Sequence, residues 1–188
     1  GNGHGTFLTG VMAGDDAVTL TMNVGMAPGA QWIACKACSD GGVCSDYTLN
    51  ACVGWLLEPN GNSANRPHII LFALSSDSSG WFVPQIGVWQ SAGILVVTKP
   101  GNDGPDCNTM QWPGAEIGLT AGATDEDDLI GWFSSRGPGP YGLIKPHVTA
   151  PGVTVCSTYP VNSWICDYSG TACSTAHAAG LAALLYSA

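Results

Sequence analysis

Short runs of apolar residues alternate with longer mixed segments along most of this chain. The runs 68–74 (HIILFAL) and 94–98 (ILVVT) consist almost entirely of apolar residues, which is typical of strands covered on both faces. A weaker run at 116–124 (EIGLTAGAT) predicts another strand. Nearer the N-terminus, 30–37 (AQWIACKA) predicts a further buried strand.

The segments between and after these runs carry helix signals. Ser45 can cap a helix, and Asp46 suits the first turn of the same helix. Pro84 stands near the start of a second helical segment, and Gly93 stands at its end. The predicted helices cover 45–57, 81–93 and the small-residue segment 171–188.

The order of these elements predicts the fold class. Strands that alternate with helices favour an α/β fold, in which a mainly parallel central sheet has helices on both faces and forms three layers. We find no internal repeat and no linker, so we treat residues 1–188 as part of a single domain. In such sheets, sites form at the carboxyl ends of the strands, where glycine-rich loops follow 68–74 and 94–98.

Composition and charge exclude several classes of partner. The chain has 45% hydrophobic residues and only 10% charged residues, which suits a globular domain. Its net charge is −9, and its five basic residues are scattered, so we expect it to bind neither nucleic acid nor anionic membranes. No apolar run is long enough to span a bilayer.

Eight cysteines are many for an intracellular domain of this size. The even number favours disulfides and therefore an extracellular or secretory location. Cys156 and Cys166 flank a proline-containing loop and could form a bridge. The pairing of the others stays open, and the four cysteines within 35–52 could instead hold zinc, although their spacing does not fit the usual pattern.

Four segments, in a consistent order, resemble motifs of the subtilisin-like serine peptidases (subtilases, family S8). GNGHGTFLTGVMAG at 1–14 resembles the histidine motif of that family, and PGNDGP at 100–105 resembles the loop that carries its oxyanion asparagine. FSSRGPGPYGLIKPHVTAPG at 133–152 and YSGTACSTAHAAGLAALL at 168–185 resemble two further motifs. The spacing around two tryptophans resembles the bacillopeptidase F-like branch: Trp81 and Trp89.

The resemblance assigns catalytic roles to three positions. His4 stands at the position of the general base, and Asn102 stands at the position of the oxyanion donor. The nucleophile position is Ala172, whose methyl group cannot attack a carbonyl carbon. Plainer interpretations stay open, because His4 could serve only at a helix start and Asn102 could be an ordinary turn residue.

The substrate-binding walls implied by the resemblance also differ from the family pattern. One wall has a Ser-Trp-Gly or Ser-Leu-Gly segment in the family, and the other has Ala-Ala-Gly. The second wall of this chain contains a proline, which lacks an N–H group, and a lysine much bulkier than alanine. The aligned positions are Ala73, Leu74 and Ser75 in the first wall, and Lys99, Pro100 and Gly101 in the second.

These departures favour a natural loss of catalysis over a single substitution in an intact site. We therefore expect a pseudopeptidase, inactive with Ala172, that serves as a structural or protein-binding module of a larger secreted or surface protein. The alternative is a subtilisin-like endopeptidase whose nucleophile serine was replaced by Ala172. Expected partners are proteins or peptides, including other segments or chains of a larger assembly.

The resemblance also bears on the limits of the domain and on cofactors. In the family, the catalytic aspartate lies on a strand before the histidine motif, and further helices follow the nucleophile helix. We therefore expect residues 1–188 to be an interior portion of the domain, incomplete at both ends. No cofactor is expected; calcium is conceivable at the acidic run 125–128, but that run lacks a ligand spacing.

Overall fold

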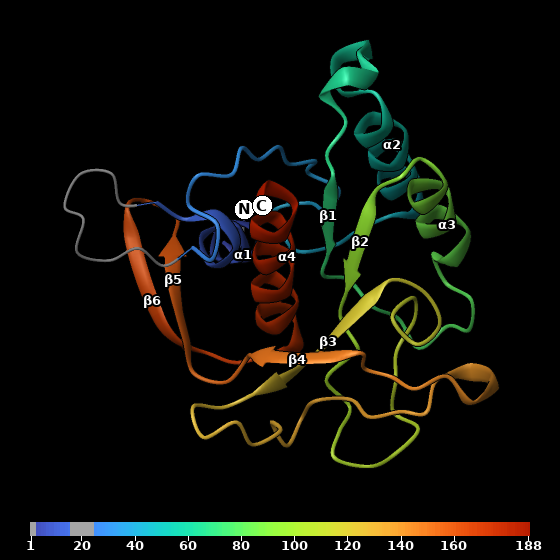
Figure 1. Ribbon diagram of the computed structural model, residues 1–188, viewed down its shortest axis with the longest axis vertical. Coiled ribbons are helices and arrows are strands. Elements are labelled where there is room, and N and C mark those ends of the chain that lie inside the picture. Colours follow the sequence, from blue (N-terminus) through green and yellow to red (C-terminus); the bar gives the residue numbers. More distant parts are fainter. Residues whose placement is uncertain (1–2, 16–24) are drawn as a thin grey trace.

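Four strands run parallel to one another and form the central sheet, in the spatial order β1-β2-β3-β4 (Figure 1). The computed structural model describes residues 3–15 and 25–188, so the first two positions of the histidine motif lie outside the described residues. Three of the strands confirm those predicted from the apolar runs, and β4 was not predicted. The strands are β1 (Ile69–Phe72), β2 (Leu95–Thr98), β3 (Leu119–Thr124) and β4 (Val148–Pro151).

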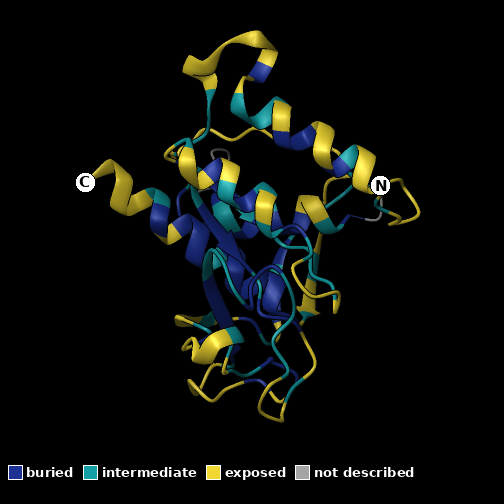
Figure 2. Cartoon of the chain, turned by 90° about the vertical axis from the view of Figure 1, so that its right-hand side faces the viewer, coloured by how far each residue is buried: buried dark blue, intermediate teal, exposed yellow. Residues whose placement is uncertain are grey.

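Helices cover both faces of this sheet and complete the predicted three layers (Figure 1). Helices α1 (His4–Ala13) and α4 (Thr171–Ser187) lie against each other on one face. Helices α2 (Asp46–Leu57) and α3 (Val83–Ser91) lie on the other face. Figure 2 shows that burial is concentrated in the sheet and in the helix surfaces that face it. The predicted α/β class and all three predicted helices are therefore confirmed.

An aromatic core joins the sheet to α2 and α3. The rings of Phe72 and Phe82 stack with their centroids 4.7 Å apart, and Trp89 packs against both. The indole N–H of Trp89 donates a hydrogen bond to the carbonyl of Val53 at 3.2 Å, which satisfies its polar atom inside the core. Ile86 is completely buried in the same cluster.

Helix α4 packs closely on the opposite face because its buried residues are small. Ser174 donates a hydrogen bond to the carbonyl of Ala121 in β3 at 2.9 Å. Gly180 leaves no room for a side chain, since a Cβ atom there would lie 2.6 Å from Met26 Cβ and 2.8 Å from the carbonyl oxygen of Met12. The small residues of this segment therefore allow α4 to approach both the sheet and the end of α1.

A β-hairpin lies beside α1 and leads into α4 (Figure 1). It consists of β5 (Val155–Tyr159) and β6 (Ser163–Tyr168), and the predicted Cys156–Cys166 disulfide links the two strands. The hydroxyl of Ser157 donates to the carbonyl of Phe7 at 2.8 Å, which ties the hairpin to α1. The hairpin therefore fixes the approach to the N-terminus of α4.

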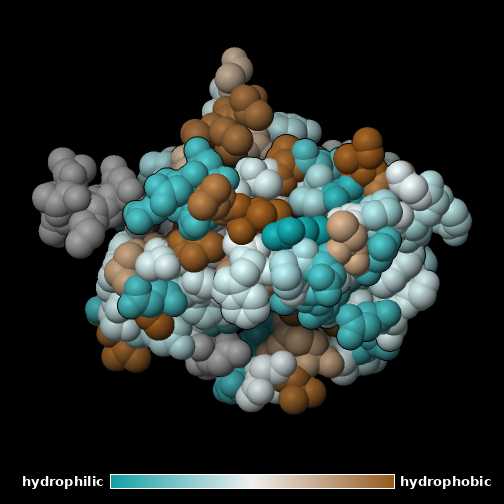
Figure 3. All heavy atoms as spheres, turned by 90° about the horizontal axis from the view of Figure 1, so that it is seen from below, coloured by the Kyte–Doolittle hydropathy of each residue, from teal (hydrophilic) through white to brown (hydrophobic). Residues whose placement is uncertain are grey.

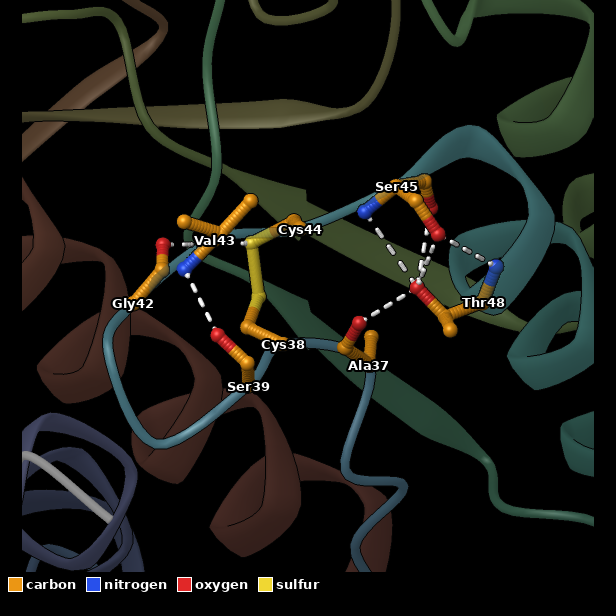
Figure 4. Close-up of a disulfide and its surroundings, with 8 residues drawn as sticks. All are labelled: Ala37, Cys38, Ser39, Gly42, Val43, Cys44, Ser45 and Thr48. Atoms are coloured by element: carbon orange, nitrogen blue, oxygen red, sulfur yellow. Dashed lines mark hydrogen bonds between the residues drawn. A yellow bond between two sulfur atoms is a disulfide. The ribbon is translucent and has the colours of Figure 1, made fainter.

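Two nested disulfides hold the segment before α2. Cys38 pairs with Cys44, as Figure 4 shows, and the hydroxyls of Ser45 and Thr48 complete a capping box at the start of α2. The second bridge encloses the first and joins the segment to α2: Cys35–Cys52. The four cysteines of 35–52 therefore form disulfides in the structure and not a zinc site.

The strand predicted over 30–37 was wrong. None of the described residues pairs with this segment as a neighbouring strand, and Trp32 and Ile33 are exposed. A strand needs a partner for its backbone hydrogen bonds, whereas here Cys35 is bonded to helix α2. The apolar residues of 30–37 therefore belong to a disulfide-linked loop and not to a strand of the sheet.

Short 3₁₀ helices occupy the loops at Pro59–Gly61, Ser63–Asn65 and Pro140–Gly142. The acidic run 125–128 forms a turn in which Asp125 Oδ1 accepts hydrogen bonds from the backbone N–H groups of Asp127 and Leu129. None of the helices in the described part of the chain combines the length and apolar character needed to cross a membrane.

The packing of α3 gives a matched test of the aromatic core. Ile86→Ala is expected to lower the free energy of unfolding by about 2–5 kcal/mol, because it removes a completely buried side chain and leaves a cavity. Val88→Ala, on the exposed side of the same helix, should change it by less than about 0.5 kcal/mol. Urea denaturation followed by tryptophan fluorescence measures both, and equal effects would contradict this packing.

Candidate active site

Ala172, at the nucleophile position of the resemblance, is the second residue of α4. Its side chain is 6% exposed and belongs to an apolar cluster that includes Phe7 and Leu8 of α1. Ala73, just after β1, packs against the same cluster. The start of α4 therefore brings residues of three separate segments together around a methyl group.

Asn102 lies in the loop after β2, and the first residue of α4 holds its carbonyl oxygen. The backbone N–H of Thr171 donates to Asn102 Oδ1 at 3.0 Å, and the hydroxyl of Thr171 lies 2.7 Å from the same oxygen. That hydroxyl is also 3.0 Å from the carbonyl oxygen of Gly101. A Cβ atom on Gly170 would lie 3.7 Å from Asn102 Nδ2, so the amide nitrogen of Asn102 lies near the residue that precedes α4.

His4 is the first residue of α1 and is partly buried beside the β-hairpin. Its ring centroid lies 6.0 Å from that of Tyr168, the last residue of β6. Burial lowers the pKa of His4 below its usual value, and the positive charge of Lys99 lowers that pKa further. Burial also lowers the pKa of Lys99, against the opposing charge of Asp103. The imidazole of His4 is therefore neutral near pH 7.

The residues after Ala172 do not replace the missing hydroxyl. Cys173 is completely buried, and burial raises the pKa of its thiol to about 12, so the reactive thiolate is absent at neutral pH. Ser174 is also completely buried, and its hydroxyl lies 2.9 Å from the carbonyl oxygen of Ala121 and 3.0 Å from that of Thr171. Its hydroxyl therefore faces the sheet.

The first predicted wall directly follows β1, and its side chains point in different directions. Ala73 packs towards α4, whereas Leu74 packs against the aromatic core on the other face of the sheet. The hydroxyl of Ser75 lies 2.5 Å from Oε1 of Gln111 and donates to it. Ser75 is the residue of this wall with a polar side chain, and it contacts Gln111, which also bonds to the second wall.

The second predicted wall directly follows β2. Pro100 is buried, and its carbonyl accepts a hydrogen bond from the N–H of Gln111 at 2.7 Å. Gly101 has φ +111°, a conformation that favours glycine, and its carbonyl accepts from the N–H of Ser135 at 3.2 Å. Hydrogen bonds from two neighbouring loops thus hold the backbone of Pro100 and Gly101 in this wall.

The structure adds three residues that sequence reasoning missed. Thr171 orients Asn102, Tyr168 lies beside His4, and Gln111 contacts both walls. Thr171 follows Gly170, the N-cap residue of α4, and the contact of its hydroxyl with the loop after β2 became visible only in the fold. Tyr168 and Gln111 gave no signal either, because only the fold brings them to the site.

These residues gather at the end of the molecule where the parallel strands end, as expected for this class of fold. Seen from below, the surface of the molecule carries hydrophobic residues in groups between hydrophilic ones (Figure 3). Within residues 3–15 and 25–188, we find no group of three or more His, Cys, Asp or Glu side chains that could hold a metal ion. The chemical groups of the described site are backbone groups, the amide of Asn102, the imidazole of His4 and the side chain of Lys99.

Comparison with known proteins finds relatives that match nearly the whole chain. It is 33% identical to bacillopeptidase F of Bacillus subtilis (strain 168), over 97% of this chain and 13% of that protein. It is also 33% identical to serine protease AprX of the same organism, over 98% of this chain and 48% of the other. With subtilisin Savinase of Lederbergia lenta the identity is 34%, over 98% of this chain and 63% of that protein.

The chain therefore spans less than two thirds of the length of these relatives. Solved structures agree with this match: Sphericase superposes with a TM-score of 0.84 and 27% identity, over 98% of this chain and 63% of that one. The S41 psychrophilic protease gives a TM-score of 0.83, with the same identity and the same coverage. The model of the subtilase family matches residues 1–188. Together with the fold and the order of the motifs, these matches show that the chain belongs to the subtilase family.

Proposed function

We propose that this chain is a subtilase-fold pseudopeptidase that binds protein or peptide segments without hydrolysing them. The observation that carries the proposal is the buried methyl group of Ala172 at the start of α4. Acyl transfer of this kind needs a hydroxyl or thiol nucleophile within hydrogen-bond reach of a base. Cys173 and Ser174 do not supply one, because both are buried and Ser174 faces the sheet.

The charge beside His4 also supports a loss of catalysis. In a serine peptidase the histidine takes a proton from the nucleophile, and a carboxylate stabilises the imidazolium that forms. Here burial lowers the pKa of the His4 imidazole most, and the positive charge of Lys99 lowers it further. Lys99 therefore disfavours the protonated histidine on which such a mechanism depends.

The part of the site that remains has a role in the fold. The contacts of Thr171 with Asn102 and Gly101 join the loop after β2 to the N-terminus of α4. These contacts need no nucleophile, so they can persist after catalysis is lost. The proposal thus explains why the loop and the helix start keep the family pattern while Ala172 and Lys99 depart from it.

The setting that we propose is a larger secreted or surface protein. Three disulfides are typical of an oxidising compartment. Trp32 and Trp132 are 57% and 75% exposed, which is unusual for residues of this size and supports contacts with other segments or chains.

The alternative function is that of a subtilisin-like serine endopeptidase whose nucleophile serine was replaced by Ala172. Relatives named as proteases favour it. The amide nitrogen of Asn102 lies near Gly170, just before α4, and an oxyanion donor is expected in this region. The two proposals differ in whether a hydroxyl at position 172 restores activity.

A fluorophosphonate probe decides between the two proposals, because it labels an activated serine. The full-length protein and its Ala172→Ser variant are treated with the probe, and labelling is followed by mass spectrometry. We expect no labelling of either protein, because Lys99 disfavours the imidazolium and the walls are altered. Ala183→Ser, a partly exposed position on the same helix, controls for non-specific reaction. Labelling of Ala172→Ser together with hydrolysis of a peptide would refute the pseudopeptidase proposal.

The effect of Lys99 on His4 can be tested separately. Lys99→Met removes the charge and keeps most of the side-chain length, so the pKa of His4 should rise while burial still holds it below its usual value. Lys36→Met serves as the control, because Lys36 is exposed and paired with Asp40. NMR titration of the histidine ring protons measures both variants. An unchanged or lower pKa of His4 in Lys99→Met would contradict the proposed interaction.

A further inference from the structure

Both backbone polar groups of Thr120 in β3 are bonded to one residue, His147, which directly precedes β4. The backbone N–H of His147 donates to the carbonyl of Thr120 at 3.0 Å. The backbone N–H of Thr120 donates to Nδ1 of the His147 ring at 3.1 Å. Thr120 is completely buried, so the imidazole satisfies a backbone donor that bulk water does not reach.

These two hydrogen bonds lie where β4 begins to pair with β3. β4 is the last strand in the order of the described sheet, and its pairing with β3 begins at Ala121 and Val148 (Figure 1). The carbonyl of Ala121 also accepts the hydroxyl of Ser174 in α4. The contact between His147 and Thr120 is therefore next to a point where α4 bonds to the sheet.

A buried cation holds the side chain of the same threonine. Nζ of Lys145 donates to the hydroxyl of Thr120 and to the carbonyl of Gly118, each at 3.1 Å. Burial lowers the pKa of Lys145 to about 8, and the charge of Glu116 opposes this shift. Lys145 is therefore mostly protonated at pH 7, with its positive charge close to His147.

The hydrogen bond from Thr120 requires a neutral His147. A neutral imidazole can accept at Nδ1, whereas both nitrogens of the protonated ring carry a hydrogen and can only donate. Burial lowers the pKa of His147 below its usual value, and the charge of Lys145 lowers it further. The ring of His147 is nevertheless exposed enough for a proton from solvent to reach it.

Other titratable groups near β4 are placed differently. His177 of α4 bonds to the carbonyl of Pro151, at the opposite end of β4 from His147. Glu116, before β3, acts on Lys145. Within the described part of the chain, Lys145 is thus the charged group that acts on the ring of His147.

We propose that His147 is an acid-sensitive switch that holds the start of β4 on β3 and releases it as the pH falls. On protonation, Nδ1 gains a hydrogen that faces the N–H of Thr120, and a second positive charge appears near Lys145. The hydrogen bond then breaks and leaves a buried N–H without its acceptor. This role does not depend on whether the candidate active site hydrolyses peptides.

The direction of the pH effect follows from the lowered pKa. Because the folded protein favours the neutral ring, the stability that this contact contributes is fully present above about pH 6.5, the usual pKa of histidine. It is lost as the pH falls from there towards the lowered pKa of His147. Lys145 keeps its charge throughout this range, because its pKa is about 8.

Hydrogen exchange measured by mass spectrometry tests the switch in the full-length protein. Exchange of the peptide that contains Thr120 is compared at about pH 7.5 and about pH 5, after correction for the intrinsic pH dependence of exchange. We expect its protection to fall about threefold to tenfold at the lower pH, as for the loss of one hydrogen bond. Unchanged protection in the native protein would overturn the proposal, and this result needs no variant.

Variants at position 147 separate the switch from other effects of acid. His147→Asn keeps an acceptor, because its Oδ1 is bonded to Cγ as Nδ1 is in histidine, and it does not titrate, so protection should be the same at both pH values. His147→Ala removes the acceptor and should give low protection at both. His68→Asn removes an exposed histidine just before β1 and should keep the native response.

Thermal unfolding at about pH 7.5 shows whether each variant folds. An equal fall in protection in a folded His147→Asn protein and in the native protein would show that another group senses the acid, and would overturn the role of His147. If His147→Asn does not fold, the folded His147→Gln protein takes its place, because its amide oxygen also accepts without titrating.

Discussion

The close packing of α4 on the central sheet is the constraint on which the rest of this structure depends. Its buried positions are alanine, glycine, serine, threonine and one cysteine, all of them small, so the helix backbone can approach the sheet and the end of α1. Ser174 reaches β3 with its hydroxyl, and Gly180 accommodates Met12 and Met26. A larger residue at Gly180 would move the helix away and with it the N-terminus that carries Ala172.

The site is a consequence of that packing. Once α4 is in place, its first residue meets the loop after β2, where Thr171 holds Asn102 and the backbone of Gly101. The same arrangement places a peptidase nucleophile and its oxyanion donor, and in this chain it surrounds a methyl group. A nucleophile at position 172 can therefore be replaced by alanine without disturbing the elements that form the site. This is the basis of the proposed pseudopeptidase.

Much of the fold followed from local patterns, whereas the contacts within the site did not. The apolar runs at 68–74 and 94–98 and the capping signal at Ser45 gave strands and a helix close to those observed. The prediction of a strand at 30–37 was wrong because apolar residues alone do not show whether a strand has a partner for its hydrogen bonds. Gln111 was missed because its neighbours are distant in sequence and only the fold brings them to it.

We infer that the contact between Asn102 and the start of α4 is kept because it stabilises the fold. The free energy of unfolding of Asn102→Ala tests it most directly, with Asn102→Asp as the variant that retains the accepting oxygen. We expect Asn102→Ala to lower the free energy of unfolding by about 1–2 kcal/mol, because the backbone N–H of Thr171 loses its acceptor while its hydroxyl keeps the carbonyl of Gly101, and Asn102→Asp to lower it less. A change below about 0.5 kcal/mol in Asn102→Ala would contradict it.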